Sequence, residues 1–230
     1  MTETVIFDLD GLLVDSEITW YQVTKDLVES YGGSFPLEEY VKNHSGKTIV
    51  DNAELFRTTY HIPLDRETIA QNMKAAESHY VGEGIPLKKG ARELLSFLKE
   101  NGYRVLLGSS SEKERAIRIL ESNQVDGYFD DIVVGYDVER SKPFPDIFLL
   151  AAKRAGSKPE NCLVLEDSAA GIQAADAAGI PVICIPDLKK PGEEDRNKTK
   201  AVLSSLEDVI DYLMEEKKMG KERERDGEDA

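Results

Sequence analysis

Cysteine and long apolar runs are both scarce in this chain. Its 230 residues include only two cysteines, too few for a disulfide framework. Cys162 and Cys184 lie in apolar, strand-like runs, so we expect buried, reduced thiols. No stretch approaches the apolar length that a membrane-spanning helix needs. The first strand begins close to the N-terminus without a leader-like segment, and we therefore expect a cytoplasmic protein.

Basic residues are few relative to acidic ones. The chain has 29 lysines and arginines against 44 aspartates and glutamates, which gives a formal net charge of −15. Because no basic stripe is visible, nucleic acid and anionic membranes are poor candidate partners. An acidic protein that handles an anionic substrate needs a local cationic device, such as a metal ion, a lysine or a helix N-terminus. We expect the chain to act as a monomer.

Apolar periodicity divides the chain into two kinds of region. One strand-like run lies near the N-terminus, and others alternate with helical patterns after residue 84, whereas residues 17–84 show helical patterns only. The alternation predicts an α/β fold with a parallel sheet covered on both faces. We predict a core domain from residues 1–16 and 85–215 and an inserted helical cap from residues 17–84. The last clear helix ends at Met214, and the charged tail, residues 216–230, is expected to be disordered.

Two acids stand where the first strand should end. Asp8 and Asp10 follow the apolar run, and Gly11 then allows the chain to turn sharply. In a regular strand, positions i and i+2 share one face, so the two side chains would lie together. Two negative charges at so short a distance favour the binding of a cation between them, such as Mg²⁺. The alternative is that the two acids merely cap a strand and open a turn.

Other reactive groups occur near the ends of later strands. They are Ser109, Ser110, Lys142, Glu166 and Asp167. The carboxyl ends of parallel strands meet at one edge of a sheet, where ligands bind. A carboxylate can attack phosphorus, a second can shuttle a proton, and a metal ion, a hydroxyl and an ammonium can bind phosphoryl oxygens. Each group alone also fits a helix cap or a surface charge, but together they favour phosphoryl transfer.

Four short motifs occur in order along the chain. They are Asp8-Leu9-Asp10-Gly11 with Asp15-Ser16-Glu17, Leu107-Gly108-Ser109-Ser110, Ser141-Lys142-Pro143, and Leu165-Glu166-Asp167-Ser168 with Ala170-Gly171. In this combination the chain resembles the haloacid dehalogenase superfamily, in the branch of beta-phosphoglucomutase and small sugar phosphatases. The resemblance covers residues 5 to about 187. It implies a Rossmann-like parallel sheet core with an inserted helical cap, and Mg²⁺ as cofactor.

The resemblance also implies roles for the acids. Asp8 would be the nucleophile that forms an aspartyl-phosphate, and Asp10 would be the general acid and then the general base. Mg²⁺ would be held by Asp8, Asp10 through its carbonyl, and Asp167, with Glu166 near enough to ligate or orient. The dehalogenases of the superfamily lack the second acid, so the chain should not be one of them.

Phosphate binding is implied in the same way. Ser109, with backbone amides around Gly11 and Ser110, would bind the phosphoryl group. Lys142 would bridge Asp8 and the phosphate. We therefore expect a Mg²⁺-dependent phosphatase that acts on a small phosphorylated metabolite, most simply a sugar phosphate.

Cap residues bear on the mutase alternative. Trp20 stands where the mutase has an acid–base histidine, and Ile49 stands where it has an arginine that grips the distal phosphate. Lys47 is nearby but lacks the bidentate fork of arginine. These departures favour a phosphatase, with Glu17, Trp20 and Lys47 as candidate substrate contacts. Trp20 also fits ordinary packing within the cap.

Three other features of the sequence suggest different functions. Gly46-Lys47-Thr48 imitates the end of a nucleotide-binding P-loop, but Val41 stands where that motif needs glycine and no strand precedes it. The three histidines, His44, His61 and His79, lack metal-site spacing. A receiver-type phosphorylation switch shares the acids, serine and lysine but has no inserted cap, and it places its phospho-acceptor on a middle strand.

Overall fold

The structure divides into two compact units. It is a computed structural model that describes residues 2–228, with side chains through residue 220. One unit comprises Met1–Val14 and Leu87–Ala230, and the other Asp15–Pro86. These boundaries lie two residues from the expected ones. Every strand of the described residues belongs to the first unit, and the second contains helices only.

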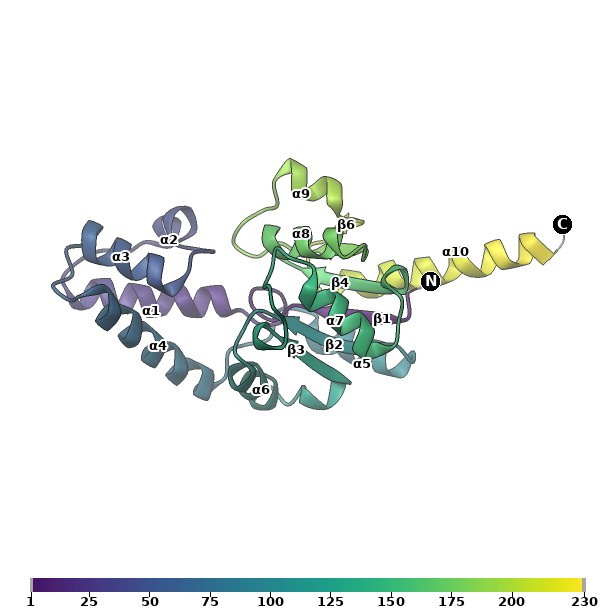
Figure 1. Ribbon diagram of the computed structural model, residues 1–230, viewed down its shortest axis with the longest axis horizontal. Helices are drawn as coiled ribbons and strands as arrows, with labels where there is room; N and C mark the ends of the chain where they lie inside the picture. The colour runs from purple at the N-terminus through teal and green to yellow at the C-terminus, as the bar shows by residue number, and fades with distance from the viewer. Residues whose placement is uncertain (1, 229–230) are drawn as a thin grey trace. The chain divides into compact units, whose positions relative to one another are not determined.

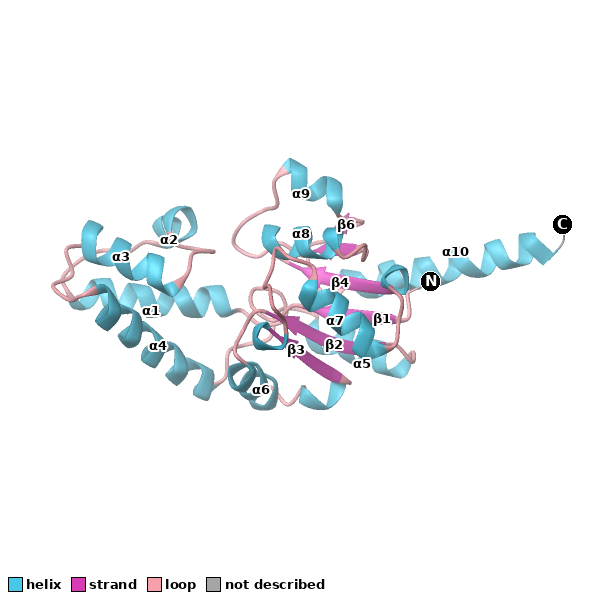
Figure 2. Ribbon diagram, viewed as in Figure 1, coloured by secondary structure: helices cyan, strands magenta, loops and turns pink. Residues whose placement is uncertain are grey.

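A parallel six-stranded sheet forms the centre of the first unit (Figures 1 and 2). The strand order is β3-β2-β1-β4-β5-β6. The strands are β1 (Thr4–Phe7), β2 (Arg104–Ser109), β3 (Asp131–Val134), β4 (Cys162–Glu166), β5 (Val182–Cys184) and β6 (Ala201–Val202). Strands covered on both faces are mostly apolar, and every residue of β1 and β4 is buried. Only β6 was not expected, because two residues carry no pattern.

Helices cover the sheet on both faces. In the first unit they are α5 (Ala91–Glu100), α6 (Lys113–Ser122), α7 (Asp146–Ala155), α8 (Ala169–Ala177), α9 (Glu193–Lys198) and α10 (Asp208–Glu228). Helix α7 packs on β1, β2 and β3, and α8 on β4 and β5. Ile6 and Phe148 belong to the resulting apolar cluster. Val5 and Phe7, which alternate with Ile6, are fully buried as well. The predicted α/β fold is therefore confirmed.

Helix α10 corrects the expectation for the C-terminal tail. The predicted helix ended at Met214, whereas α10 continues through Glu228. Glutamate, lysine and arginine, which dominate the segment after Met214, are strong helix formers, so a charged composition did not require disorder here. Residues 229–230 lie outside the described part of the chain.

The second unit has four helices in the expected places. They are α1 (Ser16–Ser30), α2 (Leu37–Asn43), α3 (Ile49–Thr59) and α4 (Arg66–Glu83). Helix α4 packs on α1 and α3. Thr48 accepts a hydrogen bond from the amide of Asp51 at 3.1 Å and so caps α3. The segment that imitates a P-loop is therefore a helix cap, and within residues 15–86, all of them described, no strand precedes it.

Both cysteines are buried and free, as predicted. Burial raises the pKa of the Cys162 thiol to about 11 and that of Cys184 to about 12, so neither is a reactive thiolate near neutral pH. Among the described residues no helix is both long and apolar enough to cross a membrane.

Candidate active site

Strand register brings distant acids to one edge of the sheet. Phe7 at the end of β1 pairs with Leu107 on β2 and with Leu165 on β4. The amide of Asp8 donates to the carbonyl of Leu165 at 3.0 Å, which continues the ladder one step beyond β1. Glu166, the last residue of β4, therefore lies beside Asp8 although most of the chain separates them.

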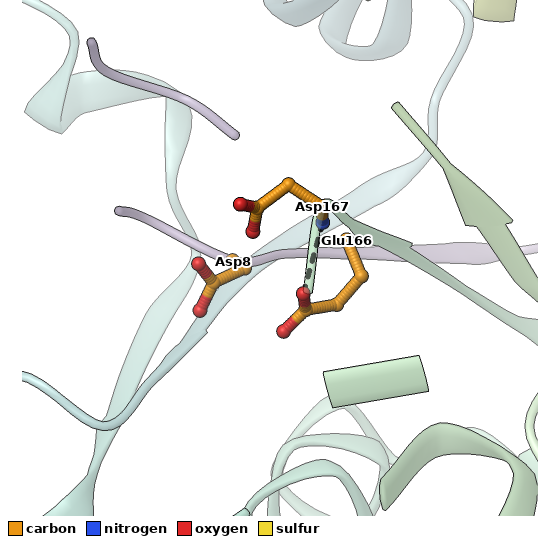
Figure 3. A group of neighbouring side chains, drawn as sticks. All are labelled: Asp8, Glu166 and Asp167. Atoms are coloured by element: carbon orange, nitrogen blue, oxygen red, sulfur yellow. Dashed lines mark hydrogen bonds between the residues drawn. The ribbon is translucent and has the colours of Figure 1, made fainter. Parts of the chain in front are cut away.

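Three carboxylates form a cluster at this edge. Oxygen atoms of Asp8, Glu166 and Asp167 lie within 4.8 Å of one another, the one potential metal-binding group found among the described residues. Figure 3 shows the carboxylates of Asp8 and Asp167 on the same side. Burial, reinforced by the charges of Glu166 and Asp10 and opposed by Lys142, raises the pKa of Asp8 to about 7. Burial and the neighbouring acids also raise the pKa of Asp167 well above its ordinary value.

Lys142 neutralises part of this charge. Its Nζ donates to Asp8 Oδ1 at 2.5 Å and to Glu166 Oε1 at 2.6 Å. Burial lowers the pKa of Lys142, but the charges of Asp8 and Glu166 outweigh that effect and hold it above its usual range. The ammonium also lies 4.7 Å from the centre of the Phe148 ring, a cation–π distance. The lysine is thus a fixed positive charge against the Asp8 carboxylate.

Glu166 is held from several sides. Its Oε2 accepts from the amides of Asp167 and Ser168 and from the Ser168 hydroxyl, each at 2.9 Å, and the first of these bonds is dashed in Figure 3. A Cβ at Gly171 would overlap the Glu166 carboxylate, so glycine is needed for helix α8 to approach. These contacts suit Glu166 better for orienting Lys142 than for acting as a principal metal ligand.

The remaining oxygens fit a magnesium ion. Asp8 and Asp167 supply hard carboxylate oxygens, and three acids against one lysine leave a buried negative charge that a divalent cation would balance. Gly11, at φ +80°, lets the chain pass close to Asp167, because a Cβ there would overlap Asp167 Oδ2. We therefore take Asp8 and Asp167 as the side chains that would hold the ion.

A fourth acid beside the site was not anticipated. Asp187 Oδ2 lies 3.2 Å from the position that a Gly11 Cβ would take, and its charge contributes to the raised pKa of Asp167 after those of Glu166 and Asp8. Asp187 pairs with Lys88 at 2.5 Å. The sequence signal that could have identified Asp187 as a site residue is its position shortly after β5.

Asp10 lies in a different setting from Asp8. Strand β1 ends at Phe7, so the two acids do not share a strand face as the sequence suggested. Asp10 instead forms a two-bond ion pair with Arg115, at 2.8 and 2.9 Å, and accepts from the Ser111 hydroxyl at 2.5 Å. Its carboxylate is outside the three-acid cluster, so any contribution of Asp10 to a metal site would come through its carbonyl.

The expected phosphate-binding groups are only partly arranged as anticipated. Ser109 ends β2 and is buried, and its Oγ accepts from the Ser111 amide at 3.1 Å. Ser110 is exposed. The Gly11 amide donates to the carbonyl of Val14 at 3.0 Å, and phosphate binding by the amides around Gly11 and Ser110 stays a prediction.

The three candidate cap residues belong to the helical unit. Glu17 accepts a hydrogen bond from the Tyr40 hydroxyl at 3.1 Å. Trp20 is half-buried on α1, and Lys47 is exposed just before α3. Their roles in substrate binding stay predictions.

Comparison with known proteins identifies the family. The model of the haloacid dehalogenase-like hydrolases matches residues 5–185. The chain belongs to this family. A Drosophila melanogaster relative named "Probable pseudouridine-5'-phosphatase" is 33% identical, over 88% of this chain and 89% of that protein. A Thermotoga maritima relative, "Phosphorylated carbohydrates phosphatase", is 30% identical, over 77% of this chain and 82% of that protein.

A solved structure supports the same assignment. The haloacid dehalogenase family hydrolase from Deinococcus radiodurans R1, with bound phosphate and sodium, is 27% identical. The match has a TM-score of 0.81 and covers 93% of this chain and 96% of that one. The superfamily and the fold inferred from the four motifs are confirmed.

Proposed function

We propose that this hydrolase removes the phosphate from a small phosphomonoester, with Mg²⁺ and through an aspartyl-phosphate on Asp8. The observation that carries the proposal is the buried cluster at the sheet edge. There Asp8 faces Lys142, while Asp167 offers a second carboxylate for the metal. This cluster combines a nucleophile, a fixed cation and an oxygen-rich metal site.

The residues divide the reaction between them. Asp8 attacks phosphorus, and the bond to the ester oxygen breaks while Asp10 gives that oxygen a proton. Lys142 stabilises the negative charge that moves from the phosphoryl oxygens toward Asp8. A magnesium ion held by Asp8 and Asp167 would further neutralise the charge of the phosphoryl oxygens. Water then attacks the aspartyl-phosphate, with Asp10 taking its proton.

A sugar phosphate is the favoured substrate. One relative, 30% identical over 77% of this chain, is named as a phosphatase of phosphorylated carbohydrates. Trp20 in the helical unit offers an aromatic face of the kind that packs on sugar rings, and Glu17 offers a hydroxyl acceptor. The expectation of a cytoplasmic monomer without nucleic-acid or membrane partners stays a prediction.

A screen of phosphate release tests this function. Hexose, pentose and other small phosphate esters are incubated with the protein and Mg²⁺. Asp8→Asn should abolish release, while Asp176→Asn, at an exposed position on α8, should leave it unchanged. Asp10→Asn should slow both half-reactions. Full activity in Asp8→Asn, or after removal of the metal by a chelator, would refute the mechanism.

The mutase alternative has a separate test. Beta-glucose 1-phosphate with a bisphosphate primer should yield free phosphate faster than glucose 6-phosphate. Water should be the final acceptor because Trp20 and Ile49 replace the side chains expected in a mutase. Isomerisation that outruns phosphate release would reverse the assignment.

A further inference from the structure

A connected polar network joins Asp10 to the loop after β2. Arg115, in the first turn of α6, places both terminal nitrogens on the two oxygens of Asp10. Ser111 donates to the same carboxylate and accepts from Arg115 at 2.7 Å. The Ser111 amide also donates to Ser109. Asp10 is thereby linked to the serine that ends β2.

The ion pair fixes the geometry of the Asp10 carboxylate. A single bond would leave a carboxylate able to rotate, whereas the planar guanidinium binds both oxygens and sets the plane. Arg115 is only 15% exposed, against 35% for Asp10. The arginine is therefore the more enclosed partner.

We propose that Arg115 is a positioning residue for Asp10 in the breakdown of the aspartyl-phosphate, an inference that rests on the proposed function. In that step the oxygen of water forms a bond to phosphorus. The bond between phosphorus and the Asp8 oxygen breaks, and its electron pair returns to the Asp8 carboxylate. One proton of the water passes to Asp10. The attack needs a correctly placed acceptor, and misplacement by about 1 Å can cost about 100-fold in rate.

Pre-steady-state kinetics with p-nitrophenyl phosphate isolate this step. The nitrophenolate leaves without needing a proton, so the first half-reaction does not depend on Asp10. Arg115→Met should lower steady-state turnover by about 10- to 100-fold. It should also produce a burst of nearly one nitrophenolate per enzyme, because the phosphoenzyme accumulates. A merely structural role would lower the active fraction without creating a burst.

Three further variants distinguish the positioning of Asp10 from the effect of the Arg115 charge and from a loss of folding. Arg115→Lys keeps the charge but loses the fork, and it should resemble Arg115→Met. Ser111→Ala removes one donor to Asp10 and should give a weaker version of the same burst, even if Arg115→Met proves unstable. Arg118→Met, at an exposed position of the same helix, should behave as wild type.

The outcomes distinguish the two proposals. If wild-type protein turns over the ester and Asp8→Asn does not, the phosphatase function stands. Arg115→Met and Ser111→Ala without a burst, or with wild-type turnover or faster, would then overturn the positioning role alone. If wild type shows no turnover that depends on Asp8, both proposals fall.

Discussion

Lys142 and Asp8 form a buried ion pair across 134 positions of the sequence. Replacing Lys142 by methionine would leave Asp8 and Glu166 without the ammonium that both contact. Loss of one partner of a buried pair costs about 3–5 kcal/mol, so the free energy of unfolding should fall by that order. Turnover should fall at least about 100-fold, because a donor to the transferred charge is lost.

Urea unfolding and phosphatase assays of Lys142→Met check this prediction. Lys153→Met, at an exposed position on α7, is the matched control and should stay within about 0.5 kcal/mol of wild type. Equal stability of the two variants would show that the Lys142 pair contributes nothing to folding.

Gly171 is required by the position of the Glu166 carboxylate. A Cβ at this position would overlap Glu166, which three donors and Lys142 hold in place. Gly171→Ala should therefore destabilise the protein by about 1–3 kcal/mol, as overpacking does. Turnover should fall as well, since a displaced Glu166 carries Lys142 with it.

Gly82→Ala provides the control for that substitution. Gly82 lies in α4, and apart from its own chain neighbours and the adjacent helix backbone no heavy atom lies within 4 Å of where its Cβ would be. Alanine there should stabilise the helix by up to about 1 kcal/mol. Urea unfolding compares the two variants, and a Gly171→Ala protein as stable as wild type would show that Glu166 can move without cost.

The fold and the grouping of the main acids were predictable from the alternation of strands and helices. That alternation implies a parallel sheet, and the carboxyl ends of parallel strands meet at one edge of the sheet. The sequence therefore predicts that Asp8 and Asp167 lie together, with Lys142 in a loop that follows another strand. The prediction that Asp10 and Asp8 share one face of a strand was wrong. It assumed that the strand continues through Asp10, whereas β1 ends at Phe7.

Arg115 and Asp187 were missed for a different reason. Arg115 lies in a helix and Asp187 in a loop, and the packing of those elements decides where the side chains point. The extent of α10 was missed because a charged segment is compatible with both a helix and disorder. The helix propensity of its residues, rather than their net charge, accounts for the length of α10.

Magnesium should stabilise the unit that contains the acid cluster. A ligand at about 100 times its dissociation constant adds about 2.7 kcal/mol to the free energy of unfolding. For a domain of this size that gain corresponds to a rise in Tm of roughly 5–10 °C. Calorimetric scans with Mg²⁺ and with a chelator check the effect without an activity assay. Asp167→Asn should reduce the rise and Asp176→Asn should not. A rise that survives Asp167→Asn would place the ion elsewhere.

His44 should make the helical unit sensitive to acid. Its ring is buried, stacks on Phe56 with centroids 4.8 Å apart, and has Nδ1 3.0 Å from Asn52 Oδ1. Burial lowers the pKa of His44 below 6.5, although Asn52 and Glu39 oppose the shift and Lys47 adds to it. The neutral ring is thus favoured in the folded state.

The sign of the pH effect follows from that shift. Above about pH 6.5 the histidine is neutral in both states and costs nothing. As the pH falls below 6.5, the unfolded chain takes up the proton more readily, so the folded unit loses stability until its own lower pKa is reached. Thermal unfolding between pH 7.5 and 5.5 should show a smaller decrease for His44→Gln than for wild type. His79→Gln, at an exposed position, should keep the wild-type decrease, and identical slopes in all three proteins would exclude His44 as the titrating group.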